Sequence, residues 1–397
     1  MKNILIVSGC GKRRDTIGLI GSLLASFENL DKTKYHISLL DTDFFERNHQ
    51  PSDYKVDCYY ALENSLIDSI IRHIPRIRTL YSDRKAIITY KHILSSNHFD
   101  LVVVYQIPQY ADKLVEIAHT KQTKIVLEPF GSDILRASTS ESIRLKEAFS
   151  KADGVVGRAK SNVMIAAQEL YNVPEEKLKV QREYVRGIKL LKSLSGKLSR
   201  SEMHESIGIP TSKYNIVCGY SGRESHRHSM IINALIQVKD VLPEGYQIIF
   251  PMTYGAGEHH EIIINYANKL KEVCDGAGLN TVFMTDYKTA EQMALLHLIT
   301  DLFIEIQPTD NGNAFMIEAL FARNKIVTGR WLNYKKFEQF GIPYYLLDNP
   351  EDLPSMLRRV FTHQIEEAIV PPALVDFFDI PDDYDPSVFW AELFDTL

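Results

Sequence analysis

Residues 301–326, DLFIEIQPTDNGNAFMIEALFARNKI, contain the strongest structural signals in the chain. Residues 301–306 are mostly apolar and predict a short buried strand, whereas the polar residues 307–313 predict a loop. A helix is expected to follow, from Ala314 to Ala322. This order of strand, polar loop and helix is one that presents free backbone N–H groups to an anion.

Two carboxylates bracket the loop and the start of this helix, Asp310 and Glu318. Because its helical neighbours are apolar, a core-facing Glu318 needs a protein partner or a ligand. In the alternative interpretation, Asp310 caps the helix and Glu318 lies on a solvated face.

The strand–loop–helix pattern recurs along the chain. NILIVS (3–8) precedes a turn with two glycines, DLVVVYQ (100–106) predicts a buried parallel strand, and NIVCGY (215–220) opens a second series. The GxGxxG fingerprint of dinucleotide-binding domains is absent. The pattern predicts two doubly wound α/β domains, with a linker near residues 186–199.

The stretch 308–327, PTDNGNAFMIEALFARNKIV, resembles the donor-site motif of GT-B glycosyltransferases, family 4 in particular. That motif has an acidic residue, seven further residues and then Glu; here the first acid is Asp310 where the family usually has Glu. The resemblance implies that Asp310 lies near the donor sugar and that Glu318 holds the nucleotide ribose. The amides of the loop would face the sugar and the phosphates, which adds Asn311, Gly312 and Asn313 as donor-binding residues.

The resemblance also implies donor contacts after the strand 215–220. The family places an Arg and a Lys there; Arg223 matches the first, and Arg227 is nearest to the second with a shifted spacing. Two such cations would take up the charge of a leaving diphosphate, so we assign both to catalysis. Gly222 and Thr285 are further expected donor contacts, and a merely basic loop is the alternative.

Acceptor binding is expected on loops of the first domain, at Gly9, Gly11, Gln106 and Asp133. Asp133 belongs to a Gly-Ser-Asp segment that many family 4 enzymes share, and a helix cap is its alternative role. The family's His before this segment is missing here, since Glu128, Pro129 and Phe130 precede it.

Composition narrows the possible partners. The net charge of the 397-residue chain is −6, which argues against nucleic acid, and the four cysteines have no metal or disulfide spacing. The pair His259–His260 completes no metal-ligand pattern, so no metal and no cofactor besides the nucleotide-sugar substrate are expected. The N-terminal apolar run is too short for a signal peptide and no run spans a bilayer, so we expect a cytoplasmic protein.

Residues 71–92 are an exception to the acidic average. Six cations stand there against one acid, with Ile and Tyr between them: Arg72, Arg76, Arg78, Arg84, Lys85 and Lys91. They predict either a solvated helix face or a peripheral contact with anionic lipid at the inner face of the plasma membrane.

The resemblance identifies an α/β protein of the GT-B type, with two facing Rossmann-like domains and an interdomain cleft. The expected division is an acceptor domain at 1–190, a nucleotide-sugar domain at 191–365, and a tail at 366–397 that packs back on the domains. The implied reaction is metal-independent, retaining transfer of a sugar from a nucleotide sugar to a hydroxyl acceptor, in cell-surface polysaccharide or lipid-linked glycan synthesis. Two alternatives stay open: an inverting GT-B transferase of a deoxy-amino sugar, and a non-catalytic GT-B subunit that binds a partner.

Overall fold

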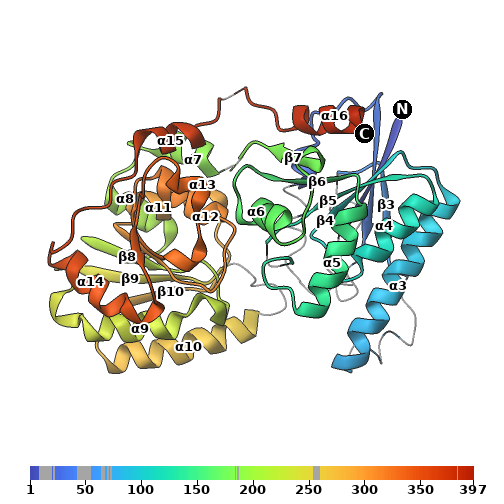
Figure 1. Cartoon of the computed structure of the whole chain (residues 1–397). Helices are drawn as coiled ribbons and strands as arrows, with labels where there is room; N and C mark the ends of the chain where they lie inside the picture. The colour runs from blue at the N-terminus through green and yellow to red at the C-terminus, as the bar shows by residue number, and fades with distance from the viewer. Residues whose placement is uncertain are drawn as a thin grey trace. The chain divides into compact units, whose positions relative to one another are not determined.

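The computed structural model describes residues 1–8, 20, 23–42, 55–63, 68, 71, 74–131, 133–183, 185, 187–253, 260–381 and 383–397. The chain divides into two compact units, which we call unit 1 (Met1–Arg182 with Asp383–Leu397) and unit 2 (Glu183–Asp382). Both are α/β units, as predicted (Figure 1). The functional division predicted at residues 190/191 and 365/366 stays a prediction.

Unit 1 contains a parallel seven-stranded sheet in the order β3-β2-β1-β4-β5-β6-β7. Alternate residues of β1 enter two different cores: Leu5 and Val7 join one, Ile4 and Ile6 the other. Helices therefore cover both faces of the sheet, which explains why this strand reads as a continuous apolar run. The strands are β1 (Lys2–Ser8), β2 (Tyr35–Asp41), β3 (Cys58–Ala61), β4 (Leu101–Tyr105), β5 (Lys124–Glu128), β6 (Gly154–Arg158) and β7 (Leu178–Gln181). The helices are α3 (Pro75–Ser96), α4 (Ala111–Thr120), α5 (Thr139–Lys151), α6 (Asn162–Glu169) and α16 (Ser387–Thr396).

Unit 2 contains a parallel six-stranded sheet in the order β10-β9-β8-β11-β12-β13. The predicted strand at 301–306 and the predicted helix at 314–322 are confirmed as β11 and α12. The strands are β8 (Tyr214–Cys218), β9 (Tyr246–Pro251), β10 (Thr281–Met284), β11 (Leu302–Glu305), β12 (Lys325–Gly329) and β13 (Tyr345–Leu347). The helices are α7 (Gly187–Leu194), α8 (Arg200–Ile207), α9 (His228–Gln237), α10 (His260–Gly276), α11 (Ala290–Ile299), α12 (Ala314–Phe321), α13 (Lys335–Glu338), α14 (Leu353–Phe361) and α15 (Pro372–Phe378).

The prediction of a linker near 186–199 is wrong for most of that stretch. Residues 187–194 form α7, whose Ile188 and Leu191 are buried in a core of unit 2. The Ser, Lys and Gly residues of GIKLLKSLSGK obscured the helical spacing of the apolar ones.

The last helix, α16, belongs to unit 1 (Figure 1). Trp390 packs edge-on against Phe27 with 5.1 Å between ring centroids, and the Tyr35 hydroxyl donates to Asp395 Oδ1 at 2.8 Å. The Lys2 ammonium donates to the carbonyl of Phe394 at 2.5 Å, so this helix is tied to the first strand of the chain. Among the described helices, none has the length and apolar character needed to cross a bilayer.

Candidate functional site

The loop at residues 307–313, between β11 and α12, is shaped by Asp310. Its Oδ2 accepts the backbone N–H groups of Gly312 (2.8 Å) and Asn313 (3.1 Å) and the hydroxyl of Tyr334 (2.9 Å). Gly312 has φ +70°, which a residue with a Cβ rarely adopts. Asp310 thus organises the loop, whereas the cap of α12 is Asn313, whose Oδ1 accepts the N–H of Met316 at 2.9 Å.

Glu318 lies on α12 and is held by a buried histidine. Its Oε2 is 3.0 Å from Nε2 of His297, which is fully buried, and the Glu318 side chain is only 16% exposed. A Cβ at position 187 would collide with the Glu318 carboxylate, so the start of α7 closes the other side. Within the described residues no hydrogen bond reaches Oε1. Glu318 is therefore a positioned carboxylate and not a plain solvated residue: Oε2 pairs with His297, and Oε1 lies against Gly187.

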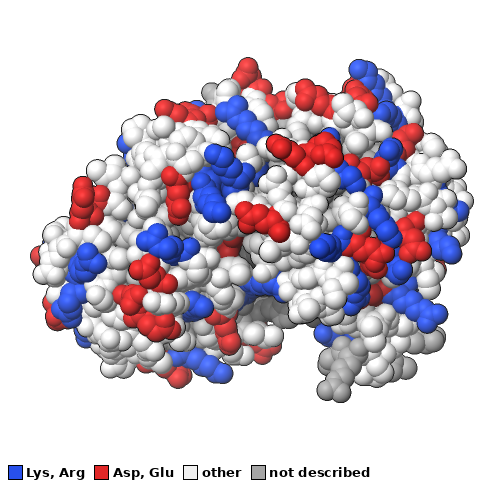
Figure 2. Space-filling model, in the orientation of Figure 1, with Lys and Arg blue, Asp and Glu red and all other residues white. Residues whose placement is uncertain are grey.

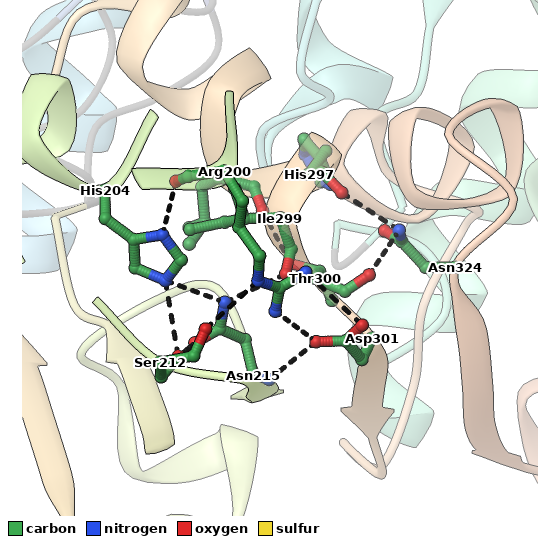
Figure 3. A network of polar contacts seen from close by, with 10 residues as sticks. Arg200, His204, Ser212, Asn215, His297, Ile299, Thr300, Asp301 and Asn324 are labelled. Carbon is green, nitrogen blue, oxygen red and sulfur yellow. Dashed lines mark hydrogen bonds and ion pairs between the residues drawn. The ribbon is translucent and has the colours of Figure 1, made fainter. Parts of the chain in front are cut away.

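A polar network fixes the elements that carry His297 (Figure 3). Asn324 donates from Nδ2 to the carbonyls of His297 and Thr300, both at 2.9 Å, and so ties the end of α11 to the segment before β12. Asn215 donates to the carbonyl of Ile299 at 2.9 Å, and its N–H donates to Asp301, which also pairs with Arg200. The network anchors α11 to β8 and β11, which sets the position of the His297 ring.

The expected cations after β8 lie in different environments. Arg223 is exposed, whereas Arg227 has φ +57° and places its guanidinium over the Trp331 ring, 5.8 Å from the centroid. A Cβ at Gly222 would come within 2.8 Å of Ile263, so close packing against α10 alone accounts for that glycine. Thr285 directly follows β10 and is half-buried. Gly222, Arg223 and Thr285 thus follow the carboxyl ends of parallel strands, where open α/β sheets bind ligands.

Three buried ionisable residues near this edge escaped the sequence-based prediction. Glu305, the last residue of β11, is fully buried, and within the described residues neither carboxyl oxygen accepts a hydrogen bond from a side chain; Nδ1 of His226 is 3.8 Å from Oε2. Burial, with the nearby Asp310 charge, raises the pKa of Glu305 well above its usual range. Burial lowers the pKa of His228 to about 4, and within the described residues neither of its ring nitrogens has a hydrogen-bond partner. The signal was present in LFIEI, where one acid interrupts an apolar strand.

In unit 1, the candidate residues Gly9 and Gly11 lie outside the described part of the chain. Asp133 accepts three backbone N–H groups, from Ile107 (3.0 Å), Phe130 (2.9 Å) and Gly131 (2.6 Å). Burial nevertheless raises its pKa. Asp133 begins a turn and not a helix, so its helix-cap alternative is wrong. Gln106 is buried with φ +58° and donates its N–H to the carbonyl of Glu128 at 3.1 Å.

A second polar cluster, which sequence reasoning also missed, joins the ends of three adjacent strands of unit 1. Glu128 ends β5, Arg158 ends β6 and Gln181 ends β7. The Arg158 guanidinium donates to Gln181 and is 3.9 Å from Oε1 of Glu128, whereas Oε2 of Glu128 has no partner. Burial raises the pKa of Glu128 to about 7, although the Arg158 charge opposes this shift.

Among the described residues, neither the distribution of surface charge nor the arrangement of possible metal ligands indicates another binding site. On the face seen in Figure 2, Lys and Arg are interspersed with Asp and Glu and form no single charged field. Within the described ranges, no group of three or more His, Cys, Asp or Glu side chains could hold a metal ion. His260 begins α10, and its neighbour His259 lies outside those ranges.

Solved structures match the chain over its whole length. Sucrose-phosphate synthase from Thermosynechococcus elongatus is 10% identical, with a TM-score of 0.67 and coverage of 100% of this chain and 99% of the other. Anabaena HepE in complex with UDP-glucose is 14% identical, with a TM-score of 0.62 and full coverage of both chains. The protein has the GT-B fold.

The same GT-B fold also occurs in a match that is not named as a transferase. UDP-GlcNAc 2-epimerase from Neisseria meningitidis, bound to UDP-GlcNAc, is 12% identical, with a TM-score of 0.58 and coverage of 100% and 99%. No protein-family model and no curated protein matches the sequence. The comparisons therefore confirm the predicted GT-B architecture, and the reaction must be argued from the residues.

Proposed function

We propose that the chain is a glycosyltransferase that moves a sugar from a nucleotide sugar to a hydroxyl acceptor. The observation that carries this proposal is the positioned Glu318: His297 holds one oxygen, and we assign the carboxylate to the ribose hydroxyls of the donor. Asp310 holds the 307–313 loop by accepting the N–H groups of Gly312 and Asn313, and we assign donor contacts to Asn311, Gly312 and Asn313 following the resemblance of the motif at 308–327. Hydrogen bonds from two hydroxyls to one carboxylate would contribute about 3 kcal/mol to donor binding.

The reaction breaks the bond between the anomeric carbon and the diphosphate, and forms a bond from the acceptor oxygen to that carbon. Charge develops on the leaving diphosphate, so Arg223 and Arg227 act there, with Gly222 and Thr285 beside the donor. The acceptor hydroxyl loses its proton to the oxygen of the departing diphosphate as it attacks. We assign acceptor contacts to Gly9, Gly11, Gln106 and Asp133, with retention of configuration and without a metal, following the resemblance of the motif at 308–327.

The first test is a thermal-shift panel of UDP-, GDP-, dTDP- and CDP-sugars with the free diphosphates. At about 100 times the dissociation constant, a bound ligand stabilises the protein by about 2.7 kcal/mol. Glu318→Gln should remove the shift and keep the fold, because glutamine still fills the space beside His297. Glu272→Gln, an exposed change on α10, is the matched control. If Glu318→Gln binds as tightly as the wild type, the donor-site assignment is wrong.

The fate of the bound nucleotide sugar separates the proposal from its rivals. A transferase should slowly hydrolyse its own donor without acceptor and release nucleoside diphosphate. An epimerase, which the same fold supports in the Neisseria meningitidis enzyme, would change the sugar at C2. A non-catalytic subunit would leave the donor intact. NMR of the product with acceptor then distinguishes retention from inversion, the latter being the deoxy-amino-sugar alternative.

A second proposal concerns α3, whose outward face could hold the protein at an anionic membrane that carries a lipid-linked acceptor. Ile77 (51% exposed), Leu80 (74%) and Ile88 (58%) repeat at helical spacing, with the exposed Arg84 and Lys91 on the same stripe. Lys85 is not counted among the lipid-binding cations, because its ammonium is 2.6 Å from the buried Asp68. Large apolar side chains beside cations are the composition of a helix that lies in a bilayer interface.

Vesicle sedimentation tests this surface. The wild type should sediment with vesicles of phosphatidylglycerol and phosphatidylcholine, and less with phosphatidylcholine alone. The triple variant Ile77→Ser, Leu80→Ser, Ile88→Ser should lose binding, since each buried large apolar side chain contributes about 1.5–3 kcal/mol. The control variant Ile143→Ser, Leu170→Ser changes two comparably exposed residues elsewhere, Ile143 on α5 and Leu170 directly after α6. Equal sedimentation of the triple variant and the wild type would leave α3 as solvated surface.

A further inference from the structure

A buried lysine joins the 307–313 loop to the start of unit 2. Lys336, on α13, is 3% exposed. Its Nζ lies 2.9 Å from Oε2 of Glu183 and donates to the carbonyl of Gly312 at 3.2 Å. Because a buried ammonium needs strong partners, both contacts constrain where the lysine can lie. Glu183 is the first residue of unit 2 and directly follows Arg182 of unit 1.

The same short helix supports the loop at other points. The Tyr334 hydroxyl, just before α13, donates to Asp310, and burial raises the pKa of Tyr334 so that it keeps its proton. A Cβ at Gly312 would collide with the Lys336 side chain and come within 3.0 Å of the Phe337 ring. The loop therefore rests on Tyr334, Lys336 and Phe337, and its glycine leaves room for the lysine.

A second contact connects this part of the chain to the other end of the site. Gly187 opens α7, and any side chain there would collide with Glu318. Glu183 thus reaches Gly312 through Lys336, while Gly187 abuts Glu318. Two residues within five positions of the crossing from unit 1 are thus connected to the segment 312–318, Glu183 through Lys336 and Gly187 by direct contact.

We propose that Lys336 is a positioning residue of the 307–313 loop and that it makes the loop's conformation depend on Glu183. The inference rests on the proposed function, because the loop is taken to bind the nucleotide sugar. Linkage is reciprocal, so a nucleotide that stabilises the loop must also stabilise the Glu183–Lys336 contact. If the pair only stabilises the fold, its loss would lower the melting temperature without a selective effect on the loop.

The test compares Lys336→Met and Glu183→Ala with Lys325→Met. The control breaks another Lys–Glu pair of unit 2, in which Lys325 Nζ is 2.8 Å from Glu367 Oε1 at the opposite edge of the sheet. Hydrogen exchange of the peptide 307–317 is measured without nucleotide. Loss of a charged hydrogen-bond donor should accelerate exchange about tenfold in Lys336→Met and about threefold in Glu183→Ala, and leave Lys325→Met unchanged.

Nucleotide binding supplies the second readout. The nucleoside diphosphate that stabilises the wild type in the thermal-shift panel should bind Lys336→Met about tenfold more weakly and Lys325→Met with unchanged affinity. In the wild type it should slow exchange of the peptide that contains Glu183. If peptide 307–317 exchanges at the wild-type rate in Glu183→Ala, the inference is wrong. The Glu183→Ala variant also supplies the test if Lys336→Met does not fold. If the wild type binds no nucleotide, the proposed function fails, whereas the exchange result still decides the role of Lys336.

Discussion

Glu128 in unit 1 and Glu305 in unit 2 are both buried carboxyl groups at the end of a strand, but their surroundings differ. Each ends a parallel strand, each is buried, and each has a carboxyl oxygen without a hydrogen-bond partner. Glu128 has a guanidinium 3.9 Å away, whereas Glu305 has an imidazole nitrogen at 3.8 Å and a second carboxylate, Asp310, nearby. Burial raises the pKa of both carboxyl groups: that of Glu128 to about 7, with the Arg158 charge opposing the shift, and that of Glu305 well above its usual range, with the Asp310 charge adding to it.

The difference should appear in the stability of each unit. A carboxyl group whose pKa is raised by folding contributes stability that is complete below its unfolded pKa, near 4.5, and is lost as pH rises toward the folded pKa. The loss ends at the folded pKa. The two tryptophans can report on the units separately, because Trp390 belongs to unit 1 and Trp331 to unit 2.

The largest effect is expected for Glu305→Gln. Above pH 4.5, wild-type unit 2 should lose up to about 1.4 kcal/mol of stability per pH unit, because burial and the Asp310 charge raise the pKa of the folded Glu305 carboxyl well above its usual range. Glutamine does not ionise, so this slope should disappear and the variant should be the more stable protein at pH 8. Urea unfolding followed by Trp331 fluorescence in a Trp390→Phe background measures it. Parallel pH profiles for variant and wild type would show that Glu305 is ionised in the folded protein.

A smaller effect is expected for Glu128→Gln. Wild-type unit 1 should lose about 3 kcal/mol between pH 4.5 and pH 7 and then level off, because its carboxyl ionises in the folded state near pH 7. The glutamine variant should show no such fall. Trp390 fluorescence in a Trp331→Phe background follows this unit during urea unfolding. If the stability of wild-type unit 1 continues to fall unchanged to pH 8, Glu128 and Glu305 do not differ in the way described.

The smallest effect, and the sharpest, is expected for Arg158→Met. Removing the charge that opposes the shift should raise the pKa of Glu128 further, so the fall in unit 1 stability should extend above pH 7 and make this unit resemble unit 2. The additional loss by pH 8 is at most about 1.4 kcal/mol. Lys124→Met, which breaks the more exposed pair with Asp153, is the control and should not move the end of the fall. If the pH at which the fall in stability ends is the same in Arg158→Met as in the wild type, the Arg158 charge does not cause the difference between Glu128 and Glu305.

The architecture followed from local patterns that the structure preserves. The apolar run before Gln307 became β11, and the spacing from Asp310 to Glu318 placed one acid in a loop and the other on the next helix. The cap of α12 could have been assigned to Asn313, because asparagine before an apolar helical run is a common cap. The surroundings of the site could not be predicted from the sequence. Arg227 meets Trp331, and Glu318 meets His297 and Gly187, through tertiary contacts between residues far apart in sequence.

The return of α16 to unit 1 has a consequence during protein synthesis. The helix covers Phe27 and contacts Lys2 on the first strand, but the ribosome makes it only after all of unit 2, Glu183–Asp382, has been translated. At about 5–20 residues per second, unit 1 waits roughly 10–40 s with this face of its core uncovered. Unit 1 therefore cannot complete its fold until the end of the chain has been made, and until then its exposed apolar face is a surface that chaperones recognise.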